Sequence, residues 1–376
     1  MTDLMDRLEQ ALPIVRDGAD SADADAKYPT ASINALADSG LLGLTLPTEV
    51  GGLGGGPVEL VEAVSAVAAA CGSTSMIYLM HLSAAMVTAA APPPDGGDEL
   101  LAGMAAGSRL GTLAFSEKGS RSHFWAPVSK AEVVEAGVKI GADKSWVTSA
   151  DAADVYITSC LAPDASGPMD TNLYALPRVT EGVQIAGRFD GIGLRGNDSA
   201  PVRLDIEIAN GARLGDNGGG FALMMQVVLP WFSLGNSAVS MGLAQAALDG
   251  AVAHASGSRF EHLDSSLSDL PTIRAYLAKS WTDLAAHKAL LRETAGKVAS
   301  PDESTMLAVL GTKAGCNEAA LRITETALRV AGGAGFSKQV GIDRPYRDAR
   351  AGFVMAPTAD ALFDFTGRAL CGLDLF

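Results

Sequence analysis

The stretch GIGLRGNDSAPVRLDIEIANG, residues 191–211, decides the class of fold. Its first six residues carry glycine at positions one, three and six, which is the spacing of a dinucleotide-binding turn. Such a turn needs a helix directly after the third glycine, because the helix N-terminus holds the pyrophosphate. Here the apolar residues instead alternate with polar or charged ones, the period of a half-buried strand; they are Val202, Leu204, Ile206 and Ile208. The stretch therefore predicts a loop followed by a strand, and not a Rossmann fold.

The same two-residue period extends over the middle of the chain. Short alternating segments separated by turn residues predict a β domain over residues 110–214. Residues 1–109 before it and 215–376 after it carry apolar residues at helical spacing. Four long segments in the last region predict a helical bundle. The expected class is α+β, mainly α, with a helical N-terminal domain, a β middle domain and a C-terminal helical bundle.

The composition is that of a well-buried globular protein. Of 376 residues, 48% are apolar and 19% are charged, and the formal net charge is −15. A chain this acidic lacks the basic face that nucleic acid requires, so we expect neither nucleic acid nor an anionic membrane surface as a partner. The four cysteines are far apart, and neither a disulfide framework nor a metal site is expected. The N-terminal residues lack the basic and apolar segments of an export signal, which predicts a cytoplasmic protein.

Two long stretches without Asp, Glu, Lys or Arg need an explanation. They are residues 63–91 and 217–248. Both approach the length of a membrane span, but the first is interrupted at CGSTS and is rich in alanine, while the second contains polar residues and a proline. Helices at the centre of an all-helical core have the same composition. We interpret both stretches as buried core helices.

Five motifs follow one another along the chain. They are LAFSEKGSRS (113–122), KSWVTSA (144–150), MGLAQAALDGAVAH (241–254), RVAGGAGF (329–336) and RPYRDAR (344–350). In this order, and over nearly the whole length, the chain resembles the acyl-CoA dehydrogenase family. The resemblance implies a helical N-domain, a middle β-barrel domain and a C-terminal four-helix bundle. It also implies an FAD-dependent oxidoreductase that acts on a CoA thioester or a related small molecule and forms a homodimer or homotetramer.

The KSWVTSA segment has the chemistry of a flavin wall. A bound isoalloxazine ring needs an aromatic surface on one face and hydrogen-bond donors along its N5/O4 edge. Trp146 and Thr148 lie two apart on a predicted strand and therefore point to one face. Without the resemblance, the pattern would also fit a Trp in the core and a Thr on the surface. With it, Trp146 covers the flavin, while Thr148 and Ser116 bond its edge.

The resemblance implies further contacts to FAD, some of them from a neighbouring subunit. Arg329, Gly332 and Gly333 match the family element that holds the pyrophosphate across the subunit boundary, although the usual residue at the first position is Gln. A cation at that position suits a diphosphate. The implied cofactor-binding residues are Phe115, Ser116, Trp146, Thr148, Ser149, Arg259, Arg329, Gly332, Gly333 and Thr358.

The substrate side departs from the family pattern. The family removes a proton next to the thioester carbonyl with a Glu. Counting from RDAR places Ala356 at that position, and counting back from Gly242 places Phe232 and Ser233 at the alternative position. Neither position holds a carboxylate. The resemblance leaves Ser122, Phe232 and Ala356 as substrate-binding residues.

Three functions remain open on these residues. Apolar side chains at both base positions favour oxygen-using chemistry of the monooxygenase or oxidase type, with O₂ as a second substrate. A dehydrogenase with a relocated base is the second possibility, and His81, His123 and Glu117 are then the candidate catalytic residues. A non-catalytic flavin-binding or acyl-CoA-binding protein is the third.

Overall fold

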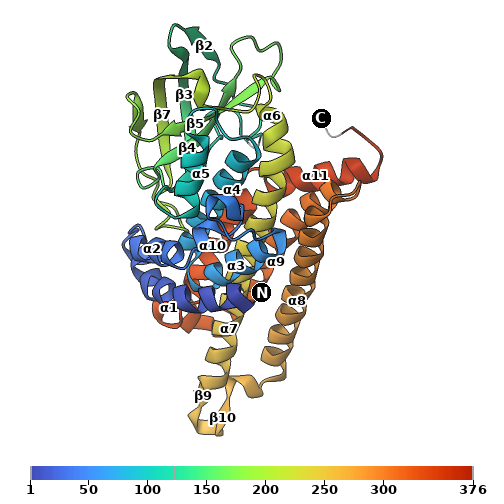
Figure 1. Ribbon diagram of the computed structural model, residues 1–376. Coiled ribbons are helices and arrows are strands. Elements are labelled where there is room, and N and C mark those ends of the chain that lie inside the picture. Colours follow the sequence, from blue (N-terminus) through green and yellow to red (C-terminus); the bar gives the residue numbers. More distant parts are fainter. Residues whose placement is uncertain (1, 122, 375–376) are drawn as a thin grey trace.

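In the computed structural model, which describes residues 2–121 and 123–374, the chain begins with five helices gathered beneath the strands (Figure 1). They are α1 (Thr2–Ala24), α2 (Thr30–Asp38), α3 (Pro57–Ala70), α4 (Gly72–Ala90) and α5 (Gly97–Ala105). The sequence accounts for the start of α3. Pro57 takes the first helical position, where an N–H would have no partner in the helix, and Gly56 N donates to Glu59 Oε2 at 3.0 Å.

The two charge-free stretches are interior helices. Helix α4 is buried along nearly its whole length, as expected of a helix that is apolar on every side. In the second stretch, α6 (Gly220–Leu223), the π-helical turn η4 (Met224–Val228) and α7 (Leu229–Gly257) form one continuous helix. Among the described residues this helix alone is long and apolar enough to cross a membrane, and 78% of its apolar window is buried inside the protein.

The strands form two four-stranded sheets. One has the order β1-β4-β5-β8 and the other β2-β3-β7-β6. The first is built from β1 (Gly111–Ala114), β4 (Val155–Leu161), β5 (Thr171–Pro177) and β8 (Arg213–Leu214), and the second from β2 (Ala131–Val134), β3 (Gly137–Val147), β6 (Val183–Ile185) and β7 (Ala200–Ile208). Strand β7 is the strand predicted after the glycine fingerprint, and its alternate residues are buried as predicted.

The middle domain takes its core from the facing surfaces of these sheets. Ile140 and Leu204 from one sheet lie in the same cluster as Tyr156 and Tyr174 from the other. Two isolated bridges link the sheet regions: Glu117, after β1, pairs with Lys144 on β3, and Lys130, next to β2, pairs with Leu161 on β4. The middle domain, expected to be a barrel, is thus a pair of facing sheets. In the described part of the chain, no strand belongs to both sheets.

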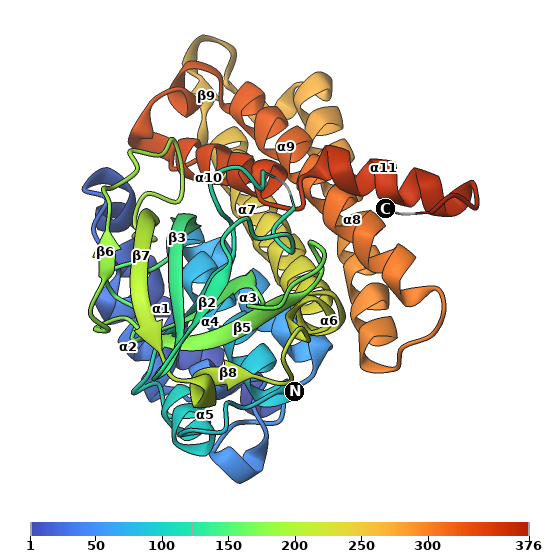
Figure 2. The same ribbon diagram turned by 90° about the horizontal axis from the view of Figure 1, so that it is seen from above.

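The C-terminal region is built on three long helices: α7, α8 (Pro271–Ala299) and α9 (Thr305–Gly335). Helix α10 (Asp343–Val354) packs on α7 and α9, and α11 (Ala359–Leu370) packs on α9 with its end extending outward (Figures 1 and 2). A hairpin of β9 (Arg259–Phe260) and β10 (Ser265–Ser266) joins α7 to α8 at the end of the molecule opposite the sheets (Figure 1).

Two glycines of the 191–196 loop, Gly193 and Gly196, are required by close packing. A Cβ on Gly193 would lie 2.6 Å from the carbonyl carbon of Arg347, and one on Gly196 would lie 2.7 Å from Ala22 Cβ. Either contact is too short for a side chain. The spacing that resembles a phosphate-binding turn therefore serves contacts with α10 and α1.

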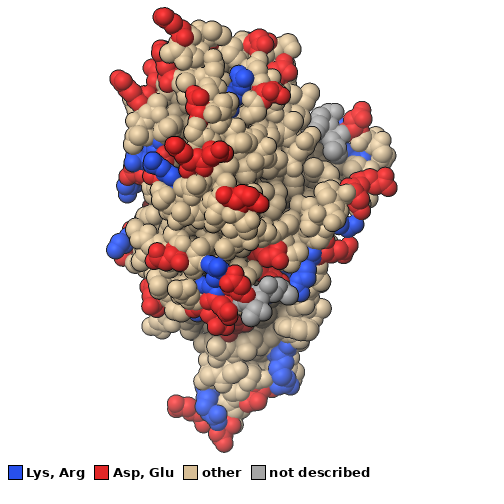
Figure 3. Space-filling view, in the orientation of Figure 1, with Lys and Arg blue, Asp and Glu red and all other residues tan. Residues whose placement is uncertain are grey.

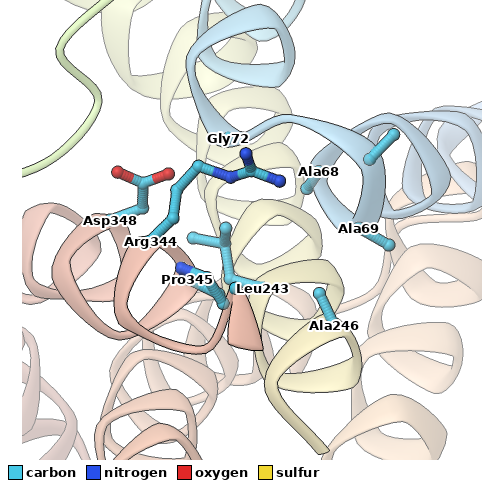
Figure 4. A pocket seen from close by; sticks show the side chains of 10 residues that line it. Ala68, Ala69, Gly72, Leu243, Ala246, Arg344, Pro345 and Asp348 are labelled. Atoms are coloured by element: carbon cyan, nitrogen blue, oxygen red, sulfur yellow. The ribbon is translucent and has the colours of Figure 1, made fainter. Parts of the chain in front are cut away.

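Hydrogen bonds fix the same loop to α10. Leu194 N donates to Asp348 Oδ1 at 2.6 Å, and the Asp348 side chain is buried. Figure 4 shows Asp348 and Arg344 rising from α10 beside Gly72, the first residue of α4. A Cβ on Gly72 would lie 2.7 Å from Asp348 Oδ2, so the absence of a side chain at Gly72 lets the Asp348 carboxyl group pack against the start of α4.

An ion pair closes this junction. The Arg347 guanidinium donates to both carboxylate oxygens of Asp23 on α1, at 2.6 and 2.7 Å, and to the carbonyl oxygen of Ile192 at 3.1 Å. Arg195 Nε donates to the Asp23 carbonyl at 2.8 Å. Segments from the start, middle and end of the chain are thus tied together next to the cavity described below.

Charged side chains are spread over the surface. On the face in Figure 3, acidic and basic side chains are interspersed, and the visible basic residues form no continuous patch. On this face, therefore, the charges are not gathered into one field of a single sign.

Candidate active site

A cavity of about 860 Å³ lies between the sheets and the helices. Its walls come from α4, the segment after β1, the end of β3, the loop before β7, the start of α7 and the segment that joins α10 to α11. This volume falls in the range of sites for cofactors and small molecules.

Eight of the sequence-predicted residues line this one cavity. They are Phe115, Ser116, Glu117, Trp146, Thr148, Phe232, Ala356 and Thr358. They come from four regions of the chain that are far apart in sequence, and only the tertiary fold brings them together.

Trp146 and Thr148 reach the cavity through an irregular backbone. The pairing of β3 with β7 shifts between Lys144 and Val147, and Trp146 has a left-handed φ of 54°. Strict alternation would give both residues the same exposure, but the Trp146 side chain is 62% exposed and Thr148 is buried. The prediction of one shared wall agrees with the cavity lining, whereas the reason offered for it, a regular strand, was wrong.

The Trp146 ring provides a flat aromatic surface. It stacks on Phe189 with the ring centroids 3.7 Å apart and the planes at 18°. Nearby, Thr148 Oγ1 lies 3.4 Å from Ser199 Oγ, and Thr112 Oγ1 donates to the Thr148 carbonyl at 2.8 Å. An aromatic face with hydroxyl groups beside it fits the requirements of an isoalloxazine ring.

Glu117 is not available as a general base, which corrects one of the catalytic predictions. Its Oε1 accepts from Lys144 Nζ at 2.7 Å and from Ser129 Oγ at 2.6 Å, and its Oε2 accepts from the N–H groups of Val128 and Ser129, each at 2.8 Å. Burial acts to raise the pKa of Glu117, but the Lys144 ammonium and these donors outweigh it and hold the pKa below its ordinary value. The carboxylate is a structural counterion.

His81 is also a structural residue, which corrects a second prediction. It is completely buried on α4 and is not part of the cavity lining. Its Nδ1 accepts from Gly111 N at 3.1 Å, so the neutral ring carries its proton on Nε2, which lies 3.1 Å from the Leu42 carbonyl. Burial lowers the pKa of His81 to about 4 and keeps the ring neutral. A lone histidine on an apolar helix serves packing here.

The remaining predicted residues on the substrate side lie elsewhere. His123 is exposed, with its ring 5.1 Å from that of Trp125, and it does not line the cavity. Ser122 lies outside the described residues. Ser149 follows Thr148 but is buried away from the cavity, and its hydroxyl has no hydrogen-bond partner among the described residues.

The residues expected to reach a neighbouring subunit are absent from the cavity of their own chain. Arg259 lies on the β9–β10 hairpin at the far end of the molecule and pairs with Asp264 at 2.7 Å (Figure 1). Arg329 lies on α9 with its guanidinium 5.7 Å from the ring centroid of Tyr276. Gly332 and Gly333 follow at the break in α9, where Gly332 has a φ of 55°.

The cavity wall is apolar at both positions where a base was sought. Phe232 on α7 and Ala356 after α10 both line it. The carboxylates in its described lining are Glu117, already neutralised by Lys144, and Asp198. Asp198 Oδ2 accepts from the N–H groups of residues 151 and 152, at 2.8 and 3.3 Å.

Several lining residues were missed from the sequence. Met76 and Met80 lie four apart on α4, a spacing that indicates only a shared helix face. Arg188 and Phe189 lie in loops, where no periodic pattern marks a residue as functional. Within residues 2–121 and 123–374, no group of three or more His, Cys, Asp or Glu could hold a metal ion.

Two domain models of one known protein family together match most of this chain. The model described as acyl-CoA dehydrogenase, N-terminal domain, matches residues 12–108, and that described as acyl-CoA dehydrogenase, C-terminal domain, matches residues 218–369. The probable acyl-CoA dehydrogenase YngJ of Bacillus subtilis (strain 168) is 28% identical over 341 residues, which cover 88% of this chain and 87% of that protein. The mitochondrial short-chain specific acyl-CoA dehydrogenase of Bos taurus is 26% identical over 334 residues, 88% of this chain and 80% of that protein.

The fold has close counterparts among solved structures. Butyryl-CoA dehydrogenase from Megasphaera elsdenii matches with a TM-score of 0.91 over 99% of this chain and 98% of that chain, at 22% sequence identity. At this identity the likeness shows a shared fold: helices, a middle domain of sheets, then helices.

Proposed function

The chain belongs to the acyl-CoA dehydrogenase family, and from that premise we propose that this oxidoreductase uses its FAD in oxygen-using chemistry on a CoA thioester or a related substrate. The observation that carries the proposal is the pair Phe232 and Ala356. Both line the cavity, and both stand where the family resemblance expects a proton-abstracting carboxylate.

The flavin ring would rest on the wall made by Trp146, Thr148 and Ser116. When bound, FAD supplies hydride acceptance and subsequent electron transfer. The protein supplies the exposed face of Trp146 and the hydroxyl groups of Thr148 and Ser116, which all line the same cavity. The ion pair of Lys144 with Glu117 anchors the segment that carries Ser116.

An apolar wall suits this chemistry better than it suits desaturation. A positioned base accounts for roughly 10²–10⁴-fold in a proton abstraction, and neither a phenyl ring nor a methyl group takes up a proton. The same side chains exclude water from the reacting centre and so limit unwanted proton transfer. Phe232 and Ala356 therefore favour a reaction whose slow step is not removal of the α-proton.

The test compares two electron acceptors. In the first assay, the bound FAD is reduced with dithionite, which supplies the two electrons that an oxygenation needs, and the enzyme is then mixed with air and acyl-CoA substrates of varied chain length and ring content. In the second assay, the oxidised enzyme meets the same substrates under nitrogen with an artificial electron acceptor. We expect an oxygenated product in the first assay and little turnover in the second. Brisk turnover under nitrogen without an oxygenated product in air would contradict the proposal, and the absence of turnover in both assays would favour a binding protein.

A dehydrogenase remains the second candidate, because the relatives named above are acyl-CoA dehydrogenases by name. With His81 and Glu117 engaged in the interior, Asp198 is the carboxylate in the described lining with an oxygen left over. Asp198→Asn keeps an acceptor for the backbone of residues 151 and 152. If it abolishes turnover under nitrogen, Asp198 is the relocated base.

We also propose that the enzyme is a homodimer or homotetramer. Arg259, Arg329, Gly332 and Gly333 lie outside the cavity of their own chain, as expected of residues that complete the FAD site of a neighbour. Arg329→Ala should then lower FAD occupancy without lowering the melting temperature of the apoprotein. A monomer by light scattering that binds FAD normally would contradict this proposal.

A further inference from the structure

Lys313 is a completely buried amine without a counterion. It lies on α9 with none of its surface exposed, and no carboxylate of the described chain forms an ion pair with it. Lys144, the other fully buried lysine, has Glu117 at 2.7 Å. Because a buried lysine is rarely tolerated without a partner, the position of Lys313 calls for a specific reason.

The partners of Lys313 are two backbone carbonyls on either side of Ala356. Its Nζ donates to the Met355 oxygen at 3.1 Å and to the Pro357 oxygen at 2.8 Å. Burial alone lowers the pKa of Lys313 to about 7. An uncharged amine has two N–H donors, which equals the number of carbonyls that it meets. The amine can therefore hold both carbonyls without an opposing charge.

These carbonyls belong to the segment that forms one wall of the cavity. Residues 355–358 join α10 to α11, and Met355, Ala356 and Thr358 line the cavity. From α7, Asn236 Nδ2 contributes a weaker contact to Met355 Sδ at 3.4 Å, and its Oδ1 has no partner among the described residues. The two bonds from Lys313 thus attach this wall to α9.

We propose that Lys313 is a positioning residue that fixes residues 355–358 as the cavity wall against which the ligand's reacting end rests. The proposal rests on the proposed function only in taking FAD and substrate as the occupants of the cavity. Lys313 itself does not line the cavity, so it acts through the backbone of its neighbours. Misplacement of a reacting group by about 1 Å costs roughly 100-fold in rate, which makes a firm wall consequential.

The test separates the loss of the hydrogen bonds that hold residues 355–358 from a general loss of stability. Lys313→Met keeps the length and apolar stem of the side chain but removes its donors. Val309→Ala, one turn earlier on α9 and equally buried, is the matched control, because it weakens the same helix without removing a hydrogen bond to the segment. Lys313→Gln, which retains two N–H donors, is the conservative variant and also serves if Lys313→Met does not fold.

The first measurement needs no ligand. Hydrogen exchange of a peptide that covers residues 355–362 should be roughly tenfold or more faster in Lys313→Met than in Val309→Ala when both are compared at equal stability. In Lys313→Gln it should return toward the wild-type rate. Equal exchange in Lys313→Met and Val309→Ala would overturn the proposal, whatever the protein's reaction proves to be.

The second measurement connects the wall to the site. In FAD-loaded protein, Lys313→Met should shift the visible flavin spectrum and lower kcat by roughly 10- to 100-fold, whereas Val309→Ala should leave the spectrum unchanged. An unchanged spectrum in Lys313→Met would overturn the positioning role. If the wild type takes up no FAD, the proposed function fails, while the exchange result still decides the role of Lys313.

Discussion

Lys144 Nζ lies 2.7 Å from Glu117 Oε1, and both side chains are sealed from solvent at 0% and 1% exposure. The pair connects β3 to the segment after β1 and thereby joins the two sheets. Lys144 also donates to the Ser159 carbonyl on β4. One ion pair therefore sets the position of the segment that carries Ser116 relative to β3, which carries Trp146.

Removal of one charge from this pair should be strongly destabilising. We expect Glu117→Gln to lower the free energy of unfolding by about 3–5 kcal/mol, because an uncompensated ammonium would remain buried. Asp205→Asn is the control, since Asp205 is 70% exposed in its pair with Lys139 and its loss should cost at most about 1 kcal/mol. Urea unfolding at neutral pH measures both. Similar losses in the two variants would show that the Glu117–Lys144 pair contributes little.

The hydroxyl of Thr148 should be visible in the properties of the flavin. Thr148→Val preserves the shape of the buried side chain and removes its donor. The loss of one hydrogen bond, about 0.5–1.5 kcal/mol, should shift the two-electron potential of bound FAD by roughly 10–30 mV. Spectroelectrochemistry against Thr282→Val, an exposed position on α8, tests this. A potential identical to that of the control would place Thr148 outside the flavin site.

A carboxylate at position 356 should restore α-proton removal. Ala356 lines the cavity, and the carbonyls on both sides of it are held by Lys313. Ala356→Glu should raise turnover of saturated acyl-CoAs under nitrogen by up to roughly 10²-fold, the lower end of the effect of a positioned base. Ala351→Glu, elsewhere in the same wall, is the control. An equal response in both variants would mean that the added charge acts only on binding.

The buried Asp348 should make stability depend on pH. Burial raises its pKa to about 6 from an ordinary value of 3.8, so between these values the folded state holds a proton that the unfolded state has lost. The free energy of unfolding should then fall as the pH rises from about 4 to about 6, by about 3 kcal/mol from this group, and remain lowered above pH 6.

Asp348→Asn keeps an acceptor for Leu194 N and removes the ionisation. Its stability relative to the wild type should therefore rise across the same pH window in urea unfolding experiments. The exposed Asp38→Asn is the control and should show no such trend. A difference between Asp348→Asn and wild type that does not change with pH would contradict the assignment.

The sequence predicts the fold well where its pattern is periodic. Alternation in β7 gives its buried face, and the absence of charge in α4 gives its interior position, because burial acts directly on the side chains concerned. Local irregularity is harder to predict. The shift in β3 and the left-handed Trp146 depend on pairing with β7, and nothing in KSWVTSA indicates them.

The candidate site could be predicted only in part, because some of its residues depend on partners that are far away in the sequence. Residues such as Trp146, Phe232 and Ala356 could be located by motif position and by counting. The role of Glu117 could not, because its counterion Lys144 lies 27 residues away on a different sheet. Likewise, the partners of His81 are backbone atoms of Leu42 and Gly111, which no side-chain pattern reveals.

The contact between Asp23 and Arg347 spans 324 residues, so it can form only late in the synthesis of the chain. At about 5–20 residues per second, a ribosome needs roughly 15–65 seconds after making Asp23 before it makes the arginine. Throughout that interval, Asp23 on α1 lacks its ion-pair partner Arg347. The 191–196 loop likewise lacks α10, against which it packs in the complete structure. The junction of α1 with α10 is therefore among the last contacts of the chain to form. A chain released before residue 347 would leave this junction open, with its apolar surfaces available to chaperones and proteases.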